Sequence, residues 1–360
     1  MTRAAHIAAA GVIVLAAPGI AQHDSASADL ASPLFTSHEL LELTIEAPLN
    51  TVFKERGQES SYHDAVMKFT ASDGTPVTLN IKVKTRGKFR LQRSTCNFPP
   101  IRVNFARKEV ENTVFAGQDK LKLVTHCQNG RDDYEQNVLL EHLIYRSYNL
   151  LTDLSFRTRL ARITYVDTDR DNADSLTKYA FFIEDEDLLA GNRGWQALEL
   201  MQVPPAAYDQ RQLNLVDVFQ FMVGNTDWDA YLKDDEQPSC CHNIKVIGDP
   251  AGPVYPVAYD FDWTGLINAR YARPAESLGT RSVRQRVFRG VCGSPASVEA
   301  VLPLFNEQRE AIYALFRNQA GLDEKHVKEA VEYLDEFYEI INDPRKVERE
   351  MIRDCRRMGE

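Results

Sequence analysis

Long hydrophobic runs are missing from this 360-residue chain beyond its first segment, so the sequence offers no transmembrane helix. An excess of basic residues is also missing, because 42 Lys and Arg stand against 52 Asp and Glu, which gives a net charge of −10. Nucleic-acid binding depends on a basic surface, so we expect no nucleic-acid partner. With 44% hydrophobic and 26% charged residues, the composition is that of a globular protein and excludes a disordered or collagen-like chain.

Paired C-x-x-C spacings are absent as well, which argues against a structural zinc site. The six cysteines are Cys96, Cys127, Cys240, Cys241, Cys292 and Cys355. An even number of cysteines in an exported chain favours disulfide bonds, and the sequence leaves their pairing open. Adjacent cysteines are poorly placed to bond to each other. We therefore expect at least one of Cys240 and Cys241 to pair elsewhere, with Cys292 as the candidate partner.

The first 21 residues have the pattern of a secretory signal peptide. Arg3 supplies a positive charge, 8–17 form an apolar segment too short to span a bilayer, and Gly19 and Ala21 are small residues of the kind that precede a cleavage site. We expect cleavage after Ala21, a flexible leader over 22–37, and a mature protein in the periplasm or outside the cell. The alternative is an uncleaved N-terminal anchor.

The first half of the chain has the pattern of β-structure interrupted by one helix. Apolar and polar residues alternate with period two, and this pattern predicts strands. A helix is expected over 137–151, where Leu140, Leu143 and Ile144 recur at helical spacing. The expected strands are 77–84, 101–105, 121–124, 159–166 and 178–183.

The second half is expected to be mainly helical, and an acidic run over 184–187 marks the junction between the halves. Two short strands interrupt the helices, at 243–247 and 254–259. The expected helices are 213–223, 297–318, 323–342 and 345–357.

The segment 224–265 carries the densest chemical signal. The loop after the helix 213–223 contains Asp227 and Asp229, Asn243 begins the next strand, and Asp260 and Asp262 follow the strand after it. Carboxylate and amide oxygens are hard ligands that suit Mg²⁺ or Mn²⁺ bridging phosphates. A carboxylate that the metal does not need can orient a hydroxyl group or take its proton.

These motifs resemble those of atypical protein-kinase-like families. Gly224-Asn225-Thr226-Asp227 together with Tyr259-Asp260 is similar to the HipA-type bacterial kinases. His242-Asn243 with Asp260-Phe261-Asp262 is similar to the CotH-type spore-coat kinases, as is Arg86-Gly87 at the end of an early strand. The resemblance implies an α+β, bilobal, protein-kinase-like fold. Its β-rich N-lobe is expected over 38–184, and its helical C-lobe, with a C-terminal helical tail, over 185–360.

The resemblance also implies roles for the residues of 224–265. Asp227 is the expected catalytic acid that orients the acceptor hydroxyl or takes its proton. Asp229 is its rival, because an insertion over 228–242 separates Asp227 from Asn243, whereas the two positions lie close together in typical kinases. The expected metal ligands are Asn243, Asp260 and Asp262.

Nucleotide phosphates are expected to bind on the β-rich half. Lys122 lies on the third expected strand and is the candidate phosphate lysine, held by Glu141 of the following helix, as in the kinase Lys–Glu ion pair. Lys84 and Lys88 compete for the role of Lys122. Arg86, Gly87 and Lys88 are candidates to cover the phosphates, with an ordinary hairpin turn as the alternative.

Together these features indicate an exported atypical kinase that transfers phosphate from ATP to a protein or small-molecule hydroxyl with Mg²⁺ or Mn²⁺. Two alternatives remain open: a non-catalytic binding module on the same scaffold, and a metal-dependent phosphohydrolase. The sequence does not identify the acceptor.

Overall fold

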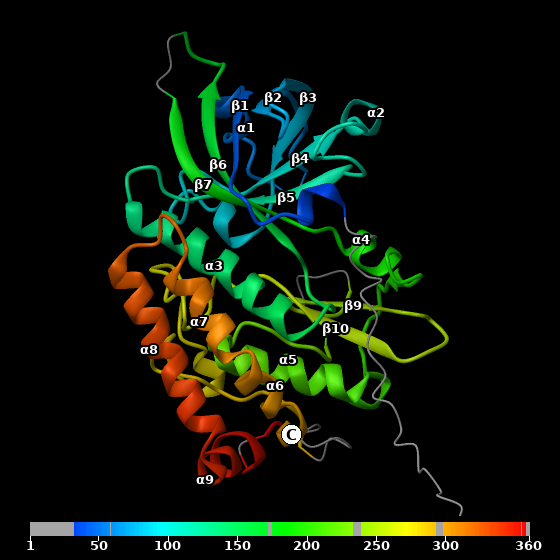
Figure 1. The fold of residues 1–360 in the computed structure, drawn as a ribbon, viewed down its shortest axis with the longest axis vertical. Coiled ribbons are helices and arrows are strands. Elements are labelled where there is room, and N and C mark those ends of the chain that lie inside the picture. Colours follow the sequence, from blue (N-terminus) through cyan, green and yellow to red (C-terminus); the bar gives the residue numbers. More distant parts are fainter. Residues whose placement is uncertain are drawn as a thin grey trace, which may run out of the picture.

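The computed structural model describes residues 32–57, 59–171, 175–232, 239–292, 298–353 and 355–357. The signal-peptide segment, most of the expected leader and the middle of the insertion over 228–242 lie outside these ranges. Figure 1 shows the β-strands of the first half gathered at one end of the molecule and helices α5, α7 and α8 at the other.

The first half forms a closed β-barrel. Its strands follow one another around the barrel in the order β1-β2-β3-β4-β5-β7-β6. The barrel closes because β6 pairs in parallel with β1, from Leu41↔Ala161 to Ala47↔Asp167. The strands are β1 (Leu41–Ala47), β2 (His63–Thr70), β3 (Pro76–Thr85), β4 (Ile101–Phe105), β5 (Lys120–Val124), β6 (Thr158–Asp167) and β7 (Leu176–Ile183).

The expected bilobal kinase-like fold is therefore wrong, because the main sheet is a closed barrel, although the mixed α+β content is confirmed. The predicted strands began at residue 77, so β1 and β2 were not predicted. Without β1, the strand β6 has no parallel partner and the sheet has a free edge. Leu41, Leu43 and Ile45 are buried at alternate positions of β1, so the period-two signal was present in the sequence.

The barrel interior is filled by side chains, so the barrel is a packed core. Alternate residues of each strand point inward, as the period of a β-strand requires. This core includes Leu43, Ile45, Met67, Ile81, Val83, Val103, Leu121, Leu123, Ile163 and Phe182.

The long helix α3 (Asp132–Leu151) packs on the outer face of β6 and β7. Its first turn carries Asp132, Asp133 and Glu135, which interact favourably with the positive end of the helix dipole. Outward-facing Val124, Phe181 and Ile183 of the barrel join the apolar face of α3 in a second core. This second core continues into the helical half of the molecule.

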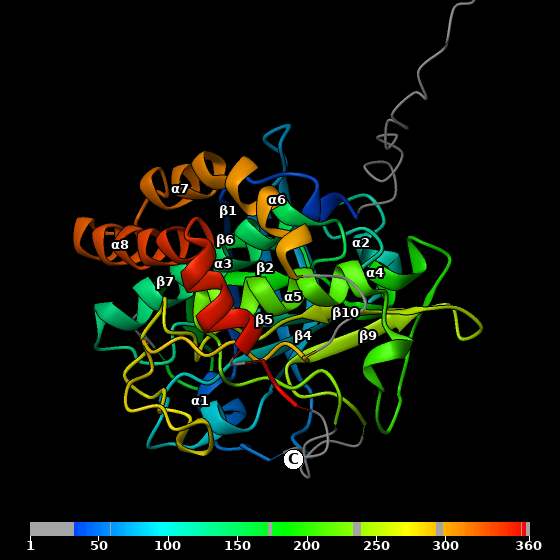
Figure 2. The same cartoon turned by 90° about the horizontal axis from the view of Figure 1, so that it is seen from below.

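Helix α5 (Gln210–Val223) is central to the helical half (Figure 2). Seen from below, it lies between the pair α7 (Arg309–Arg317) and α8 (Glu324–Ile341) and the hairpin of β9 (Ile244–Gly248) and β10 (Val254–Ala258). Gly224 ends α5 with φ +65°, and a side chain there would collide with the Tyr333 hydroxyl. Glycine is therefore required where α5 leads into the loop of Asp227.

The remaining elements are short. They comprise α1 (Leu49–Val52), α2 (Arg107–Val110), α4 (Glu186–Gly191), β8 (Gln196–Ala197), α6 (Leu302–Glu307), α9 (Pro344–Val347), a π-helical turn (Glu348–Arg353), and 3-10 turns at Pro33–Phe35, Phe89–Leu91, Pro205–Ala207, Glu276–Leu278 and Val298–Ala300. Strand β8 extends the β9–β10 hairpin to a three-stranded sheet.

The strands expected from 77 onward correspond to β3, β4, β5, β6, β7, β9 and β10. The helix expected over 137–151 begins earlier, at Asp132, and the helix expected over 297–318 is divided into α6 and α7 around Gln308. The boundary between the expected lobes at 184/185 stays a prediction.

Three disulfide bonds join Cys96 to Cys127, Cys240 to Cys241, and Cys292 to Cys355. The expectation that Cys240 or Cys241 pairs elsewhere was wrong. Cys292 instead bonds to Cys355, and this disulfide joins the C-terminal segment to the part of the chain around Cys292. Disulfide bonds in this number are typical of proteins outside the reducing cytoplasm. None of the helices within the described ranges combines the length and hydrophobicity that a membrane-spanning segment requires.

Candidate functional site

The candidate site lies on the outer side of the barrel, where β5 faces the β9–β10 hairpin and α3. Lys122 lies on β5, and its neighbours Leu121 and Leu123 point into the barrel. Glu141 comes from α3, Asn243 immediately precedes β9, and Asp260 follows β10 shortly after its end. The Lys122 ammonium group lies 5.3 Å from the centre of the Tyr259 ring, and Tyr259 directly precedes Asp260, so Lys122 and Asp260 lie on the same side of the barrel.

Asp227 is held by two neighbours from the far end of the insertion. His242 Nε2 lies 2.9 Å from Asp227 Oδ1. The Asn243 amide donates to Asp227 Oδ2 at 3.0 Å and to the Asp227 carbonyl at 2.7 Å. The Asp227 side chain is 38% exposed, so its carboxylate is accessible to another molecule. Asp227 and Asn243 are therefore in direct contact, although the insertion separates them in the chain.

Asp229 has a different environment from Asp227. Its Oδ1 accepts hydrogen bonds from the backbone N–H groups of Tyr231 and Leu232, and its Oδ2 lies 2.6 Å from Arg356 and 3.6 Å from Arg289. Burial alone would raise the pKa of Asp229, but these hydrogen bonds and Arg356 outweigh burial and lower it. Because its oxygens are already occupied, Asp229 fits a structural role better than Asp227 does.

Asp260 adopts a left-handed backbone conformation, with φ +61°, directly after Tyr259. Its backbone N–H donates to the Tyr145 hydroxyl of α3 at 2.8 Å, and the Tyr259 N–H donates to the Asn243 carbonyl at 3.1 Å. Backbone contacts thus fix Asp260 and Asn243 relative to each other. Strained backbone of this kind is common at functional sites.

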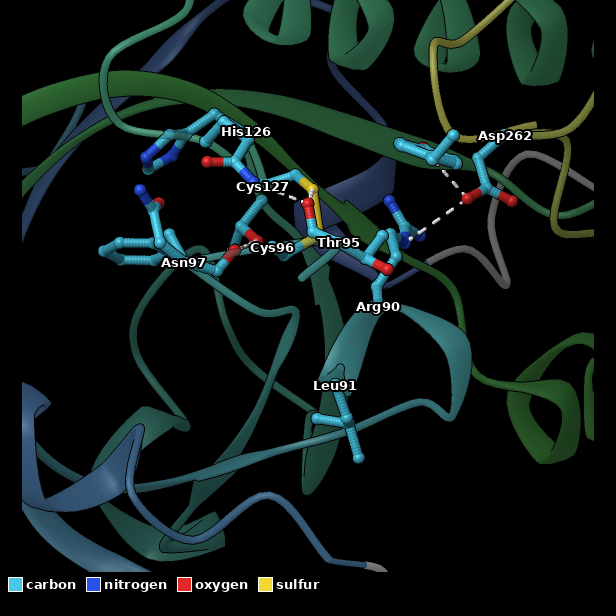
Figure 3. The surroundings of a disulfide bond; sticks show 12 residues. Arg90, Leu91, Thr95, Cys96, Asn97, His126, Cys127 and Asp262 are labelled. Carbon is cyan, nitrogen blue, oxygen red and sulfur yellow. Dashed lines mark hydrogen bonds and ion pairs between the residues drawn. A yellow bond between two sulfur atoms is a disulfide. The ribbon is translucent and has the colours of Figure 1, made fainter. Parts of the chain in front are cut away.

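Arg90 is the cation at the centre of the acidic residues, and it was not among the predicted site residues. Its guanidinium lies 3.4 Å from Asp262, 3.9 Å from Asp260 and 4.0 Å from Glu141. Figure 3 shows Arg90 pointing toward Asp262 from the side of the Cys96–Cys127 disulfide. Burial would lower the pKa of Arg90, but the surrounding carboxylates outweigh burial and raise it.

Glu141 and Asp262 are buried carboxyl groups. Burial raises the pKa of both groups above its ordinary value, and Arg90 opposes that rise. The Tyr271 hydroxyl donates to Asp262 Oδ2 at 3.0 Å. With Arg90 and Tyr271 in contact with it, Asp262 is a poorer metal ligand than the more exposed Asp260.

Lys122 pairs with Glu186 of α4 and not with Glu141. The Lys122 and Lys245 ammonium groups lie 2.9 Å and 3.0 Å from the two oxygens of Glu186, and both lie over the Tyr259 ring. Burial lowers the pKa of Lys122, and Glu186 opposes that shift. Glu186 and Lys245 were missed, although the acidic run and the strand that contain them were both identified.

The loop after β3 contributes Arg86, Gly87 and Lys88. Arg86 is half-buried, and burial lowers its pKa against the opposing charge of Asp260. Gly87 has φ +94°, a conformation that glycine adopts readily, so it turns the chain after β3. Lys88 directly precedes the 3-10 turn Phe89–Leu91, on which Arg90 lies. The loop therefore places Arg86 and Arg90 near the acidic residues.

Asn243 and Asp260 offer only part of the oxygen ligands that a divalent cation needs. Within the described ranges, no group of three or more His, Cys, Asp and Glu side chains is arranged to hold a metal ion. Asn243 uses its amide N–H to bind Asp227, and no described residue donates to its Oδ1. Mg²⁺ is commonly bound by one or two protein oxygens completed by phosphate and water. These two residues therefore suit Mg²⁺ that arrives with a phosphate group.

Comparison with known proteins gives no family assignment. No protein-family model matches this chain. No curated protein matches it either.

Proposed function

We propose that this protein transfers the terminal phosphate of ATP to a hydroxyl group of a protein or small molecule, with the help of Mg²⁺ or Mn²⁺. The observation that carries the proposal is the hydrogen bond from Asn243 to Asp227 next to the Tyr259–Asp260 segment, with the Lys122 ammonium group over the Tyr259 ring. This arrangement offers a base, oxygen ligands and phosphate-binding cations around one place, as phosphoryl transfer needs. The resemblance of the local motifs to CotH-type and HipA-type kinases supports the choice of ATP.

Asp227 is the proposed base. Its carboxylate takes the proton of the acceptor hydroxyl as the hydroxyl oxygen forms a bond to the terminal phosphorus of ATP. The bond from that phosphorus to the bridging oxygen breaks, and its electron pair stays on ADP. His242 and Asn243 hold the carboxylate in place, which reduces the entropy lost when the acceptor is aligned.

We propose that Lys122, Lys245 and Arg86 bind the negatively charged phosphate groups of ATP. Lys122 and Lys245 face each other across Glu186, and Arg86 lies near Asp260 and Tyr259. Cations in a poorly solvated place stabilise negative charge strongly, because water screens them less. Asn243 and Asp260 would hold the metal ion, which supplies further neutralisation of phosphate charge.

A non-catalytic binding module is the second candidate, and one observation favours it. Arg90 already neutralises Asp260 and Asp262 within the protein. A site that is internally charge-balanced can bind a ligand without performing chemistry on it. A phosphohydrolase, the third possibility, would use Asp227 to activate water in place of an acceptor hydroxyl.

We also infer that the chain is exported by a cleaved signal peptide ending at Ala21. The support is indirect: the three disulfides favour an oxidising compartment. N-terminal sequencing of the exported protein should then begin at Gln22.

Two measurements test the proposed function. Binding to the folded state raises the melting temperature, so Mg²⁺ and ATP together should stabilise the protein more than either alone. The purified protein should then release ADP in step with the appearance of a phosphorylated acceptor. A higher melting temperature with no release of ADP would indicate the binding module. Release of ADP together with free phosphate would indicate the hydrolase. No stabilisation by any nucleotide, with or without Mg²⁺ or Mn²⁺, would overturn the proposal.

A further inference from the structure

A cavity lies away from the candidate site, at the end of the barrel where β1 and β6 finish. Its volume is about 500 Å³, large enough for a small organic molecule. The floor is formed by core residues at that end of the barrel, among them Leu49, Phe98 and Tyr165. The candidate function uses none of the residues that line this cavity.

The apolar wall of the cavity is aromatic. Phe53 packs edge-on against Phe98 with ring centroids 4.6 Å apart, and Phe98 lies 4.6 Å from the Tyr165 ring. Phe98 and Tyr165 are buried and hold the half-buried Phe53 ring in place, so Phe53 offers a rigid aromatic surface against which another ring can pack. The wall therefore favours a ligand that contains a planar ring.

The polar wall is positively charged, although the whole chain is acidic. Lys54, Arg56, Arg93 and Arg170 line the cavity together with the carboxylate Asp167. Asp167 lies 3.6 Å from Arg170, so it partly neutralises that residue. Among the described residues, no carboxylate pairs with Lys54 or Arg93.

Arg56 makes the positive charge a fixed part of the fold. Its guanidinium donates to the backbone carbonyls of Phe53, Leu91, Cys96 and Asn97, which are neutral acceptors. Burial lowers the pKa of Arg56, and the neighbouring charge of Arg93 lowers it further. Arg56 and Arg93 thus both line the cavity, and among the described residues neither forms an ion pair with a carboxylate.

The Cys96–Cys127 disulfide holds this arrangement in place. It anchors the loop that carries Arg93, Asn97 and Phe98 to the segment following β5. In Figure 3 the disulfide lies between Asn97 and His126 on one side and Arg90 on the other. The cavity wall and the Arg90 side of the candidate site are thus parts of one cross-linked loop.

We propose that this cavity binds a small aromatic anion, a ring that carries a carboxylate or a phosphate group. The ring packs against Phe53, and the anionic group contacts Arg93 and Lys54, with the charge of Arg56 adding to the attraction. A carboxylate and a phosphate ester share this chemistry, and the experiment below distinguishes them. The proposal is independent of the ATP site.

The test uses the fluorescent aromatic sulfonate 8-anilinonaphthalene-1-sulfonate as the probe, with the full-length mature protein. Arg93 is exposed and, among the described residues, makes no ion pair, so Arg93→Gln should fold normally. Because Arg93→Gln removes one charged contact to the sulfonate, it should weaken probe binding about tenfold. Lys54→Gln is a second variant at the same wall. Arg162→Gln is the matched control, an exposed arginine on β6 outside the cavity, and it should bind like the parent.

Competition identifies the ligand class. Phenyl phosphate or benzoate should displace the probe from a single saturable site, and the stronger competitor identifies the preferred anionic group. Inorganic phosphate should displace it poorly, because it lacks the ring. The neutral analogue N-phenyl-1-naphthylamine should bind parent and Arg93→Gln equally.

Several outcomes would overturn the proposal. They are no saturable probe binding to the folded parent, equal weakening by Arg93→Gln and Arg162→Gln, or displacement by inorganic phosphate as strong as by phenyl phosphate. Mg²⁺-ATP binding should be unchanged in Arg93→Gln. Its loss there would show that the cavity is part of the nucleotide site, which contradicts the separate ligand proposed here.

Discussion

Asn243 donates its side-chain amide to both the carboxylate and the backbone carbonyl of Asp227, across an insertion that separates the two residues in the chain. The amide therefore orients the carboxylate and fixes the loop that carries it. This contact explains how an acid and an amide that are far apart in the sequence can act at one place.

Asp260→Asn should abolish most of the Mg²⁺-dependent nucleotide stabilisation while the fold survives. The substitution keeps the shape of the side chain but replaces a charged oxygen ligand by a neutral one, which hard cations bind less well. The measurement is the shift in melting temperature with Mg²⁺ and ATP. Asp64→Asn, an exposed carboxylate on β2, is the control and should behave like the parent. A variant that melts markedly lower yet binds nucleotide normally would show that Asp260 is structural.

Asp227→Asn and Asp229→Asn should separate chemistry from stability. Asp227→Asn should remove phosphate transfer with a small change in melting temperature, because its carboxylate is partly exposed. Asp229→Asn should lower the stability by about 1–3 kcal/mol, because it removes the negative charge that pairs with Arg289 and Arg356.

The pH dependence of Asp229→Asn has a definite sign. The pKa of Asp229 is lowered on folding, so its stabilisation is present above the unfolded pKa and is lost as pH falls through the folded pKa. The stability difference from the parent should therefore shrink in acid.

A reversed assignment, with transfer lost in Asp229→Asn and kept in Asp227→Asn, would make Asp229 the catalytic residue.

Asp217 should make the protein less stable as pH rises from about 4 to 8. This carboxyl on α5 is fully buried, and burial raises its pKa to about 8, with Arg289 opposing. The folded state therefore holds a proton that the unfolded state releases at lower pH, so stability falls across that interval.

Asp217→Asn tests this effect. The stability of the variant relative to the parent should increase with pH, by at most about 1.4 kcal/mol per pH unit between 4 and 8. Chemical denaturation at several pH values measures the slope, and Asp64→Asn is the exposed control. A difference that stays constant over this range would show that Asp217 is ionised in the folded protein.

Thiol titration in denaturant without reductant should detect no free cysteine in the exported protein, because all six are paired. Peptide mapping should recover Cys240 and Cys241 bonded to each other. Replacing both Cys292 and Cys355 by serine should destabilise the protein by up to about 4 kcal/mol, since their bond closes a long loop. Recovery of a Cys241–Cys292 peptide would contradict the pairing seen here.

The sequence predicted most individual elements, but not how the barrel closes. Strand β4 was identified with its observed bounds, because Ile101, Val103 and Phe105 alternate with polar residues. Closure depends on a pairing between β1 and β6, which no local pattern encodes. Since β1 was missed, the sequence did not predict a closed barrel.

The candidate site could be predicted where each residue follows a recognisable element. Asp227 follows α5, Asn243 precedes β9 and Asp260 follows β10, so local patterns were sufficient to select them. Arg90, Glu186 and Lys245 could not be selected in this way. Their significance lies in which carboxylate or cation they meet, and such partners are set by tertiary packing.

The parallel pairing of β1 with β6 has a consequence for how the chain reaches its native state. Leu41 meets Ala161, so the first strand gains its second neighbour only after most of the barrel sequence is available. Pairings between distant segments close slowly, because the loop entropy is lost before the contacts form. A fragment ending before β6 would keep the inward side chains of β1 without their full cover. We therefore expect barrel formation to be the slow, late step of folding and to depend on residues 158–183 being present.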